Sequence, residues 1–206
     1  RSNTVAVRVS EQVGRGRVID AAHRLGIPQA IDDNPSLALG ASEVTLLDLT
    51  QSYGAFATGG EAMRAWGIVE IKDADGRLLY RRQPAVERVM SPANAGRMTE
   101  MLSNVVQAGT GRAARLDRPA AGKTGTTSSS RDALFVGFTA DFVTGVWFGN
   151  DNGQPMKDVT GGTIPAELWG NFMKKASAGL PPKPLKAAPP EYAAPVAQVP
   201  WYAPWR

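Results

Sequence analysis

The 206-residue chain contains no cysteine and a single histidine, His23. The absence of cysteine excludes a disulfide scaffold and thiolate metal ligands. With one histidine, a Ser-His-Asp triad or a multi-histidine zinc site is nearly excluded. Asp151-Asn152-Gly153 lacks further oxygen ligands at a suitable spacing, so we expect a turn there rather than a cation site. We therefore predict no metal and no cofactor.

Long apolar runs are also missing. No stretch of eighteen apolar residues occurs, and no signal-peptide pattern opens the chain. Any membrane anchor is therefore expected in an N-terminal segment that is not present in this chain. The formal net charge of +4 is compatible with acidic partners, but an excess of this size more often serves solubility. We predict no nucleic-acid partner.

The most informative stretch that is present is Lys123-Thr124-Gly125-Thr126-Thr127. Together with Gly122 it resembles the end of a phosphate-binding loop, but that motif needs a first glycine at position 117, which is Asp117. It also needs a helix directly after the loop, so that several backbone N–H groups converge on phosphate. The residues that follow are not typical of a helix. A nucleotide-binding loop is therefore excluded.

The segments after this stretch favour β-structure. Residues 133–139 and 142–149 are rich in aromatic and β-branched residues and are separated by Ala140-Asp141, which predicts a tight antiparallel hairpin. We expect Lys123 to Thr127 to form a strand beside it, with Lys123 and Gly125 on one face and Thr124 and Thr126 on the other. An edge strand with a lysine, two hydroxyls and free N–H groups suits a peptide carboxylate and an oxyanion.

The rest of the chain predicts an α+β fold, an antiparallel β-sheet with helices packed on it. Apolar spacing and caps predict helices over 4–26, after Thr45, after Ser91 and over 163–178, and a hairpin around Asp73 to Gly76. Apolar residues expected on inward helix faces are Leu46, Leu49, Tyr53, Phe56, Met98, Met101, Leu102, Val105, Leu168, Phe172 and Met173.

Residues 181–206 differ from the rest of the chain. Eight of the fifteen prolines lie there, with Trp201, Tyr202 and Trp205 near the end. We predict a body over residues 1–180 and a flexible, proline-rich tail over 181–206. The alternative is that the aromatic cluster docks on a partner or on sugar.

Five segments in order resemble bacterial class A penicillin-binding proteins of the penicillin-binding and serine β-lactamase superfamily. The segment over 120–151 resembles their KTG region, and 1–14 resembles the segment with their S-x-N motif. The other three are 37–60, 90–116 and 161–176. The resemblance implies the C-terminal part of a transpeptidase domain, which acts in the periplasm and is anchored to the inner membrane.

The resemblance also implies roles for named residues. Asn3 falls at the asparagine of S-x-N, Ser2 at its variable position and Arg1 at its serine. Lys123 would supply positive potential, and Thr124 and Thr126, on either side of Gly125, would bind the terminal carboxylate of a stem peptide ending in D-Ala-D-Ala or of a β-lactam. The backbone N–H of Thr126 would be half of an oxyanion hole.

One part of the family's active site is absent from the sequence. The nucleophile lies in an S-x-x-K motif, and no serine in this chain has a lysine three places later. We therefore predict that this chain alone is inactive, and that its partner is the missing N-terminal part of the domain, on the same or a companion chain. The alternatives are a non-catalytic penicillin-recognising sensor or scaffold and a relative of the serine β-lactamases.

Overall fold

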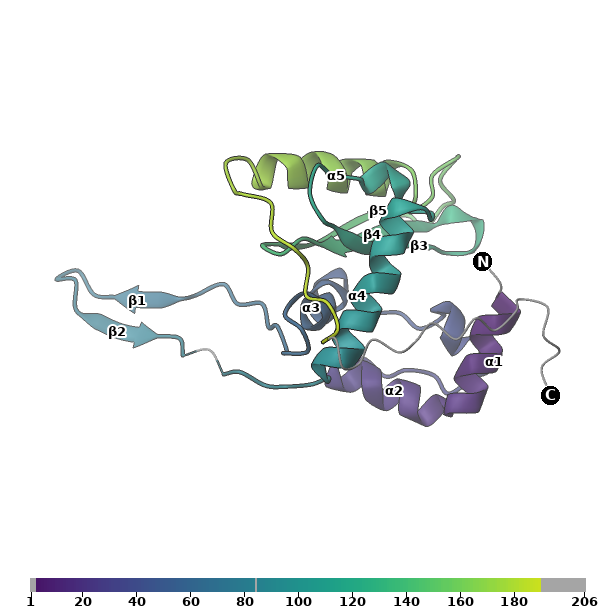
Figure 1. Cartoon of the computed structure of the whole chain (residues 1–206), viewed down its shortest axis with the longest axis horizontal. Coiled ribbons are helices and arrows are strands. Elements are labelled where there is room, and N and C mark those ends of the chain that lie inside the picture. Colours follow the sequence, from purple (N-terminus) through teal and green to yellow (C-terminus); the bar gives the residue numbers. More distant parts are fainter. Residues whose placement is uncertain (1–2, 84, 190–206) are drawn as a thin grey trace.

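The computed structural model describes residues 3–83 and 85–189 (Figure 1). Within these ranges, three strands form one antiparallel sheet in the order β3-β4-β5, and two form a separate hairpin, β1-β2. The strands are β1 (Glu70–Lys72), β2 (Leu78–Arg81), β3 (Ala121–Thr126), β4 (Asp132–Phe138) and β5 (Val143–Gly149). The α-helices are α1 (Asn3–Val13), α2 (Arg15–Arg24), α3 (Leu46–Ala57), α4 (Pro92–Gln107) and α5 (Ile164–Ala176), and the short 3-10 helices are η1 (Pro35–Leu39), η2 (Arg112–Ala114) and η3 (Ser128–Ser130).

Helices cover both faces of the three-stranded sheet (Figure 1). On one face, Trp169 of α5 packs against Phe135 of β4 with 5.1 Å between the ring centroids. On the other face, Phe56 of α3 and Leu102 of α4 form a cluster with Phe138. The odd and even positions of β4 thus face different helices, as the two-residue period of a strand requires. The predicted α+β fold with an antiparallel sheet is confirmed.

The first predicted helix is divided in two. Gly14 lies between α1 and α2 with a φ of 94°, a left-handed conformation that favours glycine. The helix expected over 4–26 is therefore two helices, and the break between them is at Gly14. Val5 and Val9, on one stripe of α1, are 58% and 51% exposed, so this stripe is not part of the core.

Two later helices lie where they were expected, but some inward residues were assigned wrongly. Met101 of α4 and Leu168 and Phe172 of α5 are 57%, 46% and 51% exposed. Small residues decide the orientation of α5, since Ala166 and Gly170 are buried beside Trp169 and let the helix approach the sheet closely. Leu102 and Met173 are buried, as predicted.

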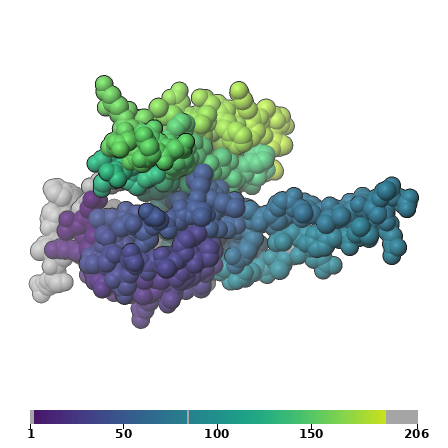
Figure 2. Space-filling model, turned by 180° about the vertical axis from the view of Figure 1, so that it is seen from behind, coloured from purple at the N-terminus to yellow at the C-terminus, as the bar shows by residue number. Residues whose placement is uncertain are grey.

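The β1-β2 hairpin projects away from the body of the molecule (Figures 1 and 2). Its turn spans Asp73 to Gly76, as expected, and Gly76 has a φ of 82°. The Asp73 carboxylate accepts hydrogen bonds from the backbone N–H groups of Asp75 and Arg77. The pairing of the two strands shifts register between Ile71 and Lys72, next to the turn.

The segment after α5, residues 180–189, runs back along the body and is called the C-terminal strap below. Leu185 packs against the Phe56–Phe138 cluster, and the Lys183 ammonium pairs with the Asp141 carboxylate at 2.5 Å. Residues 181–189 of the predicted tail are therefore packed on the body and not outside the fold. Residues 190–206, with Trp201, Tyr202 and Trp205, lie outside the described part of the chain. No helix in the described ranges is long and apolar enough to span a membrane.

Candidate functional site

The predicted binding strand is β3, which pairs antiparallel with β4 in the register Lys123↔Val136 and Thr126↔Ala133. In the sheet of the described residues, β3 is an outer strand with no neighbour on its other side. The side-chain alternation is the predicted one, because Lys123 lies opposite Val136 and Thr124 lies opposite Phe135, on the α5 face. Lys123, Thr124, Gly125 and Thr126 are therefore brought together along one sheet edge.

The register also fixes which backbone groups of β3 point away from the sheet. The N–H of Thr127 donates to the carbonyl of Asp132 across the ladder at 3.0 Å. Because bonding direction alternates along an antiparallel strand, Gly125 and Lys123 also direct their backbone groups toward β4. Thr124 and Thr126 then direct their N–H and C=O groups outward. An edge of this kind can pair with an extended peptide.

The side chain of Lys123 turns toward this outer edge. Its ammonium donates to the carbonyl oxygen of Thr124 at 2.8 Å, and the side chain is half-buried. This contact holds a positive charge next to outward-pointing backbone groups. A carboxylate at the edge would therefore meet both a cation and hydrogen-bond donors.

The two threonine hydroxyls differ in their surroundings. Thr124 is buried, and its Oγ1 lies 2.7 Å from the Oγ1 of Thr110, in the loop after α4. Thr126 is exposed, and its Oγ1 accepts a hydrogen bond from the N–H of Gly161 at 3.0 Å. A hydroxyl that accepts from Gly161 keeps its own proton to donate to a ligand.

The loop before α5 lies against the same strand. A Cβ atom on Gly161 would lie 2.4 Å from the carbonyl oxygens of Gly125 and Leu134, so only glycine fits there. On Gly162, a Cβ would lie 2.5 Å from the Thr110 carbonyl. Sequence reasoning missed Thr110, Gly161 and Gly162. Two glycines before a proline-started helix were the available signal for a close backbone approach.

Asn3 is carried by a different part of the molecule. It is the first residue of α1, its side chain is exposed, and α1 lies below the sheet against α2 and η1 (Figure 1). Arg1 and Ser2 lie outside the described residues. The structure thus brings together the β3 residues and places Asn3 on a separate helix.

The serines that follow the strand form the short helix η3. Ser129 and Ser130 have positive φ values of 60° and 52°, and backbone bonds from Ser130 to Thr127 and from Met156 to Ser130 hold the loop. Asp132 accepts a hydrogen bond from the indole of Trp147 at 2.9 Å, which is a structural role. Across residues 3–83 and 85–189, no three His, Asp or Glu side chains gather in a metal-binding arrangement.

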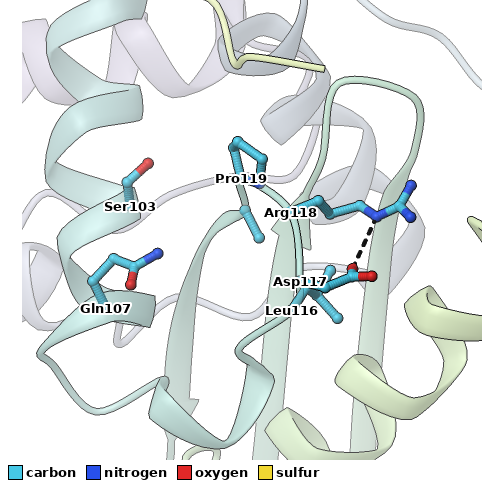
Figure 3. Close-up of a pocket in the computed structure, with 7 residues that line it drawn as sticks. Ser103, Gln107, Leu116, Asp117, Arg118 and Pro119 are labelled. Atoms are coloured by element: carbon cyan, nitrogen blue, oxygen red, sulfur yellow. Dashed lines mark hydrogen bonds and ion pairs between the residues drawn. The ribbon is translucent and has the colours of Figure 1, made fainter. Parts of the chain in front are cut away.

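A shallow pocket of about 410 Å³ lies between α4 and the segment that enters β3 (Figure 3). Ser103 and Gln107 line it from the helix, and Pro119 and Arg118 line it from the segment before β3. The Arg118 guanidinium is held by the Asp117 carboxylate at 3.2 Å and by the Leu180 carbonyl at 3.2 Å. The Nε and Nη1 atoms of Arg118 thus already have partners. Lys123, Thr124 and Thr126 do not line this pocket.

The family model for the penicillin-binding protein transpeptidase domain matches residues 2–174, most of the chain. This chain belongs to the penicillin-binding protein transpeptidase family. Penicillin-binding protein 1A from Neisseria flavescens is 39% identical over 194 residues, which are 90% of this chain and 24% of that protein. The chain therefore spans about a quarter of the length of this curated relative.

Solved structures agree with this assignment. The structure of penicillin-binding protein 1A from Haemophilus influenzae has a TM-score of 0.82 and 25% identity, and covers 91% of this chain and 34% of its own. Penicillin-binding protein A from Mycobacterium tuberculosis, solved as an imipenem acyl-enzyme complex, has a TM-score of 0.71 over 84% of this chain and 46% of its own. At 20% identity, the second likeness supports the transpeptidase fold alone.

Proposed function

We propose that this chain is the C-terminal part of a peptidoglycan D,D-transpeptidase domain and supplies the strand that binds the donor peptide. The observation that carries the proposal is the outer edge of β3, where the Lys123 ammonium lies 2.8 Å from the Thr124 carbonyl beside outward-pointing N–H groups. The donor would be a stem peptide ending in D-Ala-D-Ala. A β-lactam would occupy the same edge as an inhibitor.

Each residue of the strand has a physical role in this proposal. The exposed hydroxyl of Thr126 donates to the terminal carboxylate, and the Lys123 ammonium provides the opposite charge. The Thr124 side chain is buried beside these groups, and its hydroxyl lies 2.7 Å from the hydroxyl of Thr110. A Cβ on Gly125 would lie 2.8 Å from the Leu134 side chain, so glycine lets β3 pack beside Leu134 of β4. The N–H of Thr126 stabilises the oxyanion that forms during acyl transfer.

The covalent step requires a group from outside this chain. A serine hydroxyl attacks the carbonyl of the D-Ala-D-Ala bond, its proton passes to a base, and the terminal D-Ala leaves as an amine. The amine of a second peptide then attacks the acyl-enzyme ester and releases the serine. No serine here has the spaced lysine of S-x-x-K, so the chain alone is inactive. Asn3 would join the site when the preceding part of the domain assembles with it, as one polypeptide or as a companion chain.

The proposed place of action is the periplasm, where peptidoglycan is cross-linked. Anchoring to the inner membrane would come from an N-terminal segment, in keeping with the family. The described helices of this chain contain no candidate span.

The test is acylation of the complete protein by a fluorescent penicillin. Removing a charge-assisted hydrogen bond to the carboxylate costs about 1.5–3 kcal/mol. We therefore expect at least tenfold slower acylation in Lys123→Ala and in Thr126→Val. Lys174→Ala, on the exposed side of α5, is the matched control and should acylate normally.

Mass spectrometry of this chain with benzylpenicillin tests the missing nucleophile. No adduct is expected on this chain, and an adduct would refute the statement that it lacks a reactive serine. Binding without acylation in the complete protein would favour the non-catalytic sensor or scaffold. Rapid turnover of the penicilloyl ester would favour a β-lactamase.

A further inference from the structure

The turn that leads into α5 is closed by the side chain of Thr163. The Thr163 hydroxyl donates to the carbonyl of Thr160 at 2.8 Å and accepts a hydrogen bond from the N–H of Thr160 at 3.0 Å. The N–H of Thr163 donates to the same carbonyl at 3.0 Å. Thr160 and Thr163 are therefore joined by side-chain and backbone hydrogen bonds, and Gly161 and Gly162 lie between them.

Thr163 does not use its side chain in the way that its position predicts. It is the N-cap of α5, a helix that lies wholly within the described part of the chain, yet its hydroxyl accepts no hydrogen bond from that helix. Thr45 and Ser91, the N-caps of α3 and α4, do accept such bonds. Pro165 in the first turn of α5 has no N–H, which removes one of the donors that a cap satisfies. The Thr163 hydroxyl thus stabilises the turn and not the helix.

The turn fits closely against neighbouring backbone at both of its glycines. A Cβ on Gly161 would lie 2.4 Å from the carbonyl oxygen of Gly125 in β3. A Cβ on Gly162 would lie 2.5 Å from the carbonyl oxygen of Thr110. The turn therefore cannot move closer to the strand, and its position depends on this packing and on its internal hydrogen bonds.

Gly161 connects the turn to the candidate site. Its N–H donates to the Oγ1 of Thr126 at 3.0 Å. A threonine hydroxyl has one proton and two lone pairs. Because one lone pair of Thr126 accepts from Gly161, the hydroxyl proton is directed away from the turn. Thr126 is exposed, so this proton is available to a carboxylate.

We propose that Thr163 is a positioning residue for the donor peptide. Its hydrogen bonds with Thr160 hold the Gly161 N–H on the Thr126 hydroxyl, and this bond orients the hydroxyl proton toward the terminal carboxylate of a stem peptide or a β-lactam. Thr163 acts through Gly161 and Thr126 and makes no contact with the ligand itself. The inference rests on the proposed function of the β3 edge.

The proposal assigns the effect of Thr163 to ligand affinity and not to the covalent step. The oxyanion is stabilised by the backbone N–H of Thr126, whereas the turn acts on the Thr126 hydroxyl. A loosened turn should therefore weaken the first, noncovalent complex and leave the maximal rate of acylation unchanged. This separation is the readout that a general structural role would not produce.

The test is acylation of the complete protein by a fluorescent penicillin over a range of concentrations. Thr163→Val keeps the shape of the side chain but removes both hydrogen bonds of its hydroxyl. We expect the apparent dissociation constant to rise about two- to tenfold, the effect of losing one neutral hydrogen bond, at an unchanged maximal rate. Thr163→Ser keeps the hydroxyl and should behave like the parent. A changed maximal rate at unchanged affinity would overturn the proposal.

A double variant tests whether Thr163 acts through Thr126. Thr126→Val lacks the hydroxyl that the turn orients, so adding Thr163→Val should cause no further loss of affinity. Residues that act as one unit show such non-additive effects. The same additional loss in the presence and absence of the Thr126 hydroxyl would overturn the proposal.

Thr45→Ala is the matched control for a general loss of stability, because it removes the N-cap hydrogen bond of α3. It should leave the dissociation constant unchanged, and an equal rise in this variant would also overturn the positioning role. Normal affinity in Thr163→Val beside impaired affinity in Thr126→Val would contradict the positioning role alone. A parent that is not acylated would contradict the proposed function of the β3 edge, and the inference with it.

Discussion

The hydroxyl groups of Thr110 and Thr124 lie 2.7 Å apart, and the Thr124 side chain is buried. Thr110→Val keeps the shape of the side chain but leaves the Thr124 hydroxyl without this partner. Because an unsatisfied buried hydroxyl costs about 1–3 kcal/mol, we expect the free energy of unfolding to fall by that amount. Urea unfolding measures it. Thr110→Ser keeps the hydroxyl and is the control; equal losses in both variants would contradict a role for the bond.

Tyr53 provides a pH-dependent prediction. Burial raises the pKa of its phenol to about 12, whereas an unfolded tyrosine ionises near pH ~10. The raised pKa means that its stability contribution is complete below about pH 10 and is lost as pH rises toward about 12. Two pKa units correspond to at most about 3 kcal/mol.

The measurement is the difference in unfolding free energy between the parent and Tyr53→Phe from pH 8 to 12. We expect the variant to lose less stability than the parent above about pH 10. Tyr80→Phe, on the exposed hairpin, is the control and should follow the parent. A parent and Tyr53→Phe with parallel pH profiles would refute the assignment.

For single residues, the alternation of the β3 side chains between the two faces of the sheet was predictable, because a strand has a strict two-residue period. The sequence correctly separated Lys123 and Gly125 from Thr124 and Thr126. Thr110 was not predictable, because it belongs to a loop and meets Thr124 only through the packing of α4 on the sheet. The site roles of Asn3, Lys123, Thr124, Gly125 and Thr126 stay predictions.

Among the elements, the loop before α5 makes the closest approach to the site. Gly161→Ala would place a Cβ 2.4 Å from two carbonyl oxygens of β3 and β4. The loop must then move and release the bond from the Gly161 N–H to Thr126. We expect a loss of about 1–3 kcal/mol, as in other overpacked positions, and a change in the amide chemical shift of Thr126.

Gly153→Ala is the comparison for this loop. Its Cβ would meet nothing within 4 Å, although its φ of 67° disfavours alanine. It should therefore cost less than Gly161→Ala and leave the Thr126 amide unchanged. A Thr126 shift in Gly153→Ala of the same size would show that the effect is not local.

The existence of the helices was predictable, but their orientation was only partly so. The N-caps of α3 and α4 were predictable from the sequence. The hydroxyls of Thr45 and Ser91 accept hydrogen bonds from the N–H groups of Asp48 and Asn94. The inward face of α5 was not, because Leu168 and Phe172 are apolar and yet exposed. Small residues around Trp169 set the contact, and a count of large apolar residues does not detect them.

Over the whole molecule, the order of the elements and the sheet topology followed from local patterns, whereas the strap did not. Residues 181–189 are rich in proline and low in periodicity, so composition predicted a tail. Leu185 nevertheless packs with Phe56 and Phe138. A single apolar residue in an extended segment carries too little periodic signal to predict packing.

The strap gives a prediction of its own. Alanine normally stabilises a helix by about 1 kcal/mol relative to glycine. Gly96→Ala in α4 should instead destabilise, because its Cβ would lie 2.0 Å from the backbone nitrogen of Ala188. Gly16→Ala in α2, with nothing within 4 Å, is the control and should stabilise. Thermal unfolding distinguishes the two, and stabilisation by Gly96→Ala would show that the strap is not held against α4.

The packed strap also has a consequence for how the protein is made in the cell. Leu185 joins a cluster built from residues as distant as Phe56 and Phe138, so that cluster stays incomplete until Leu185 has been synthesised. Domains generally form as the nascent chain emerges, N-terminal parts first. A polypeptide that stops before the strap would leave apolar surface open to proteases and chaperones. Burial of this cluster is therefore completed only after the strap has been synthesised.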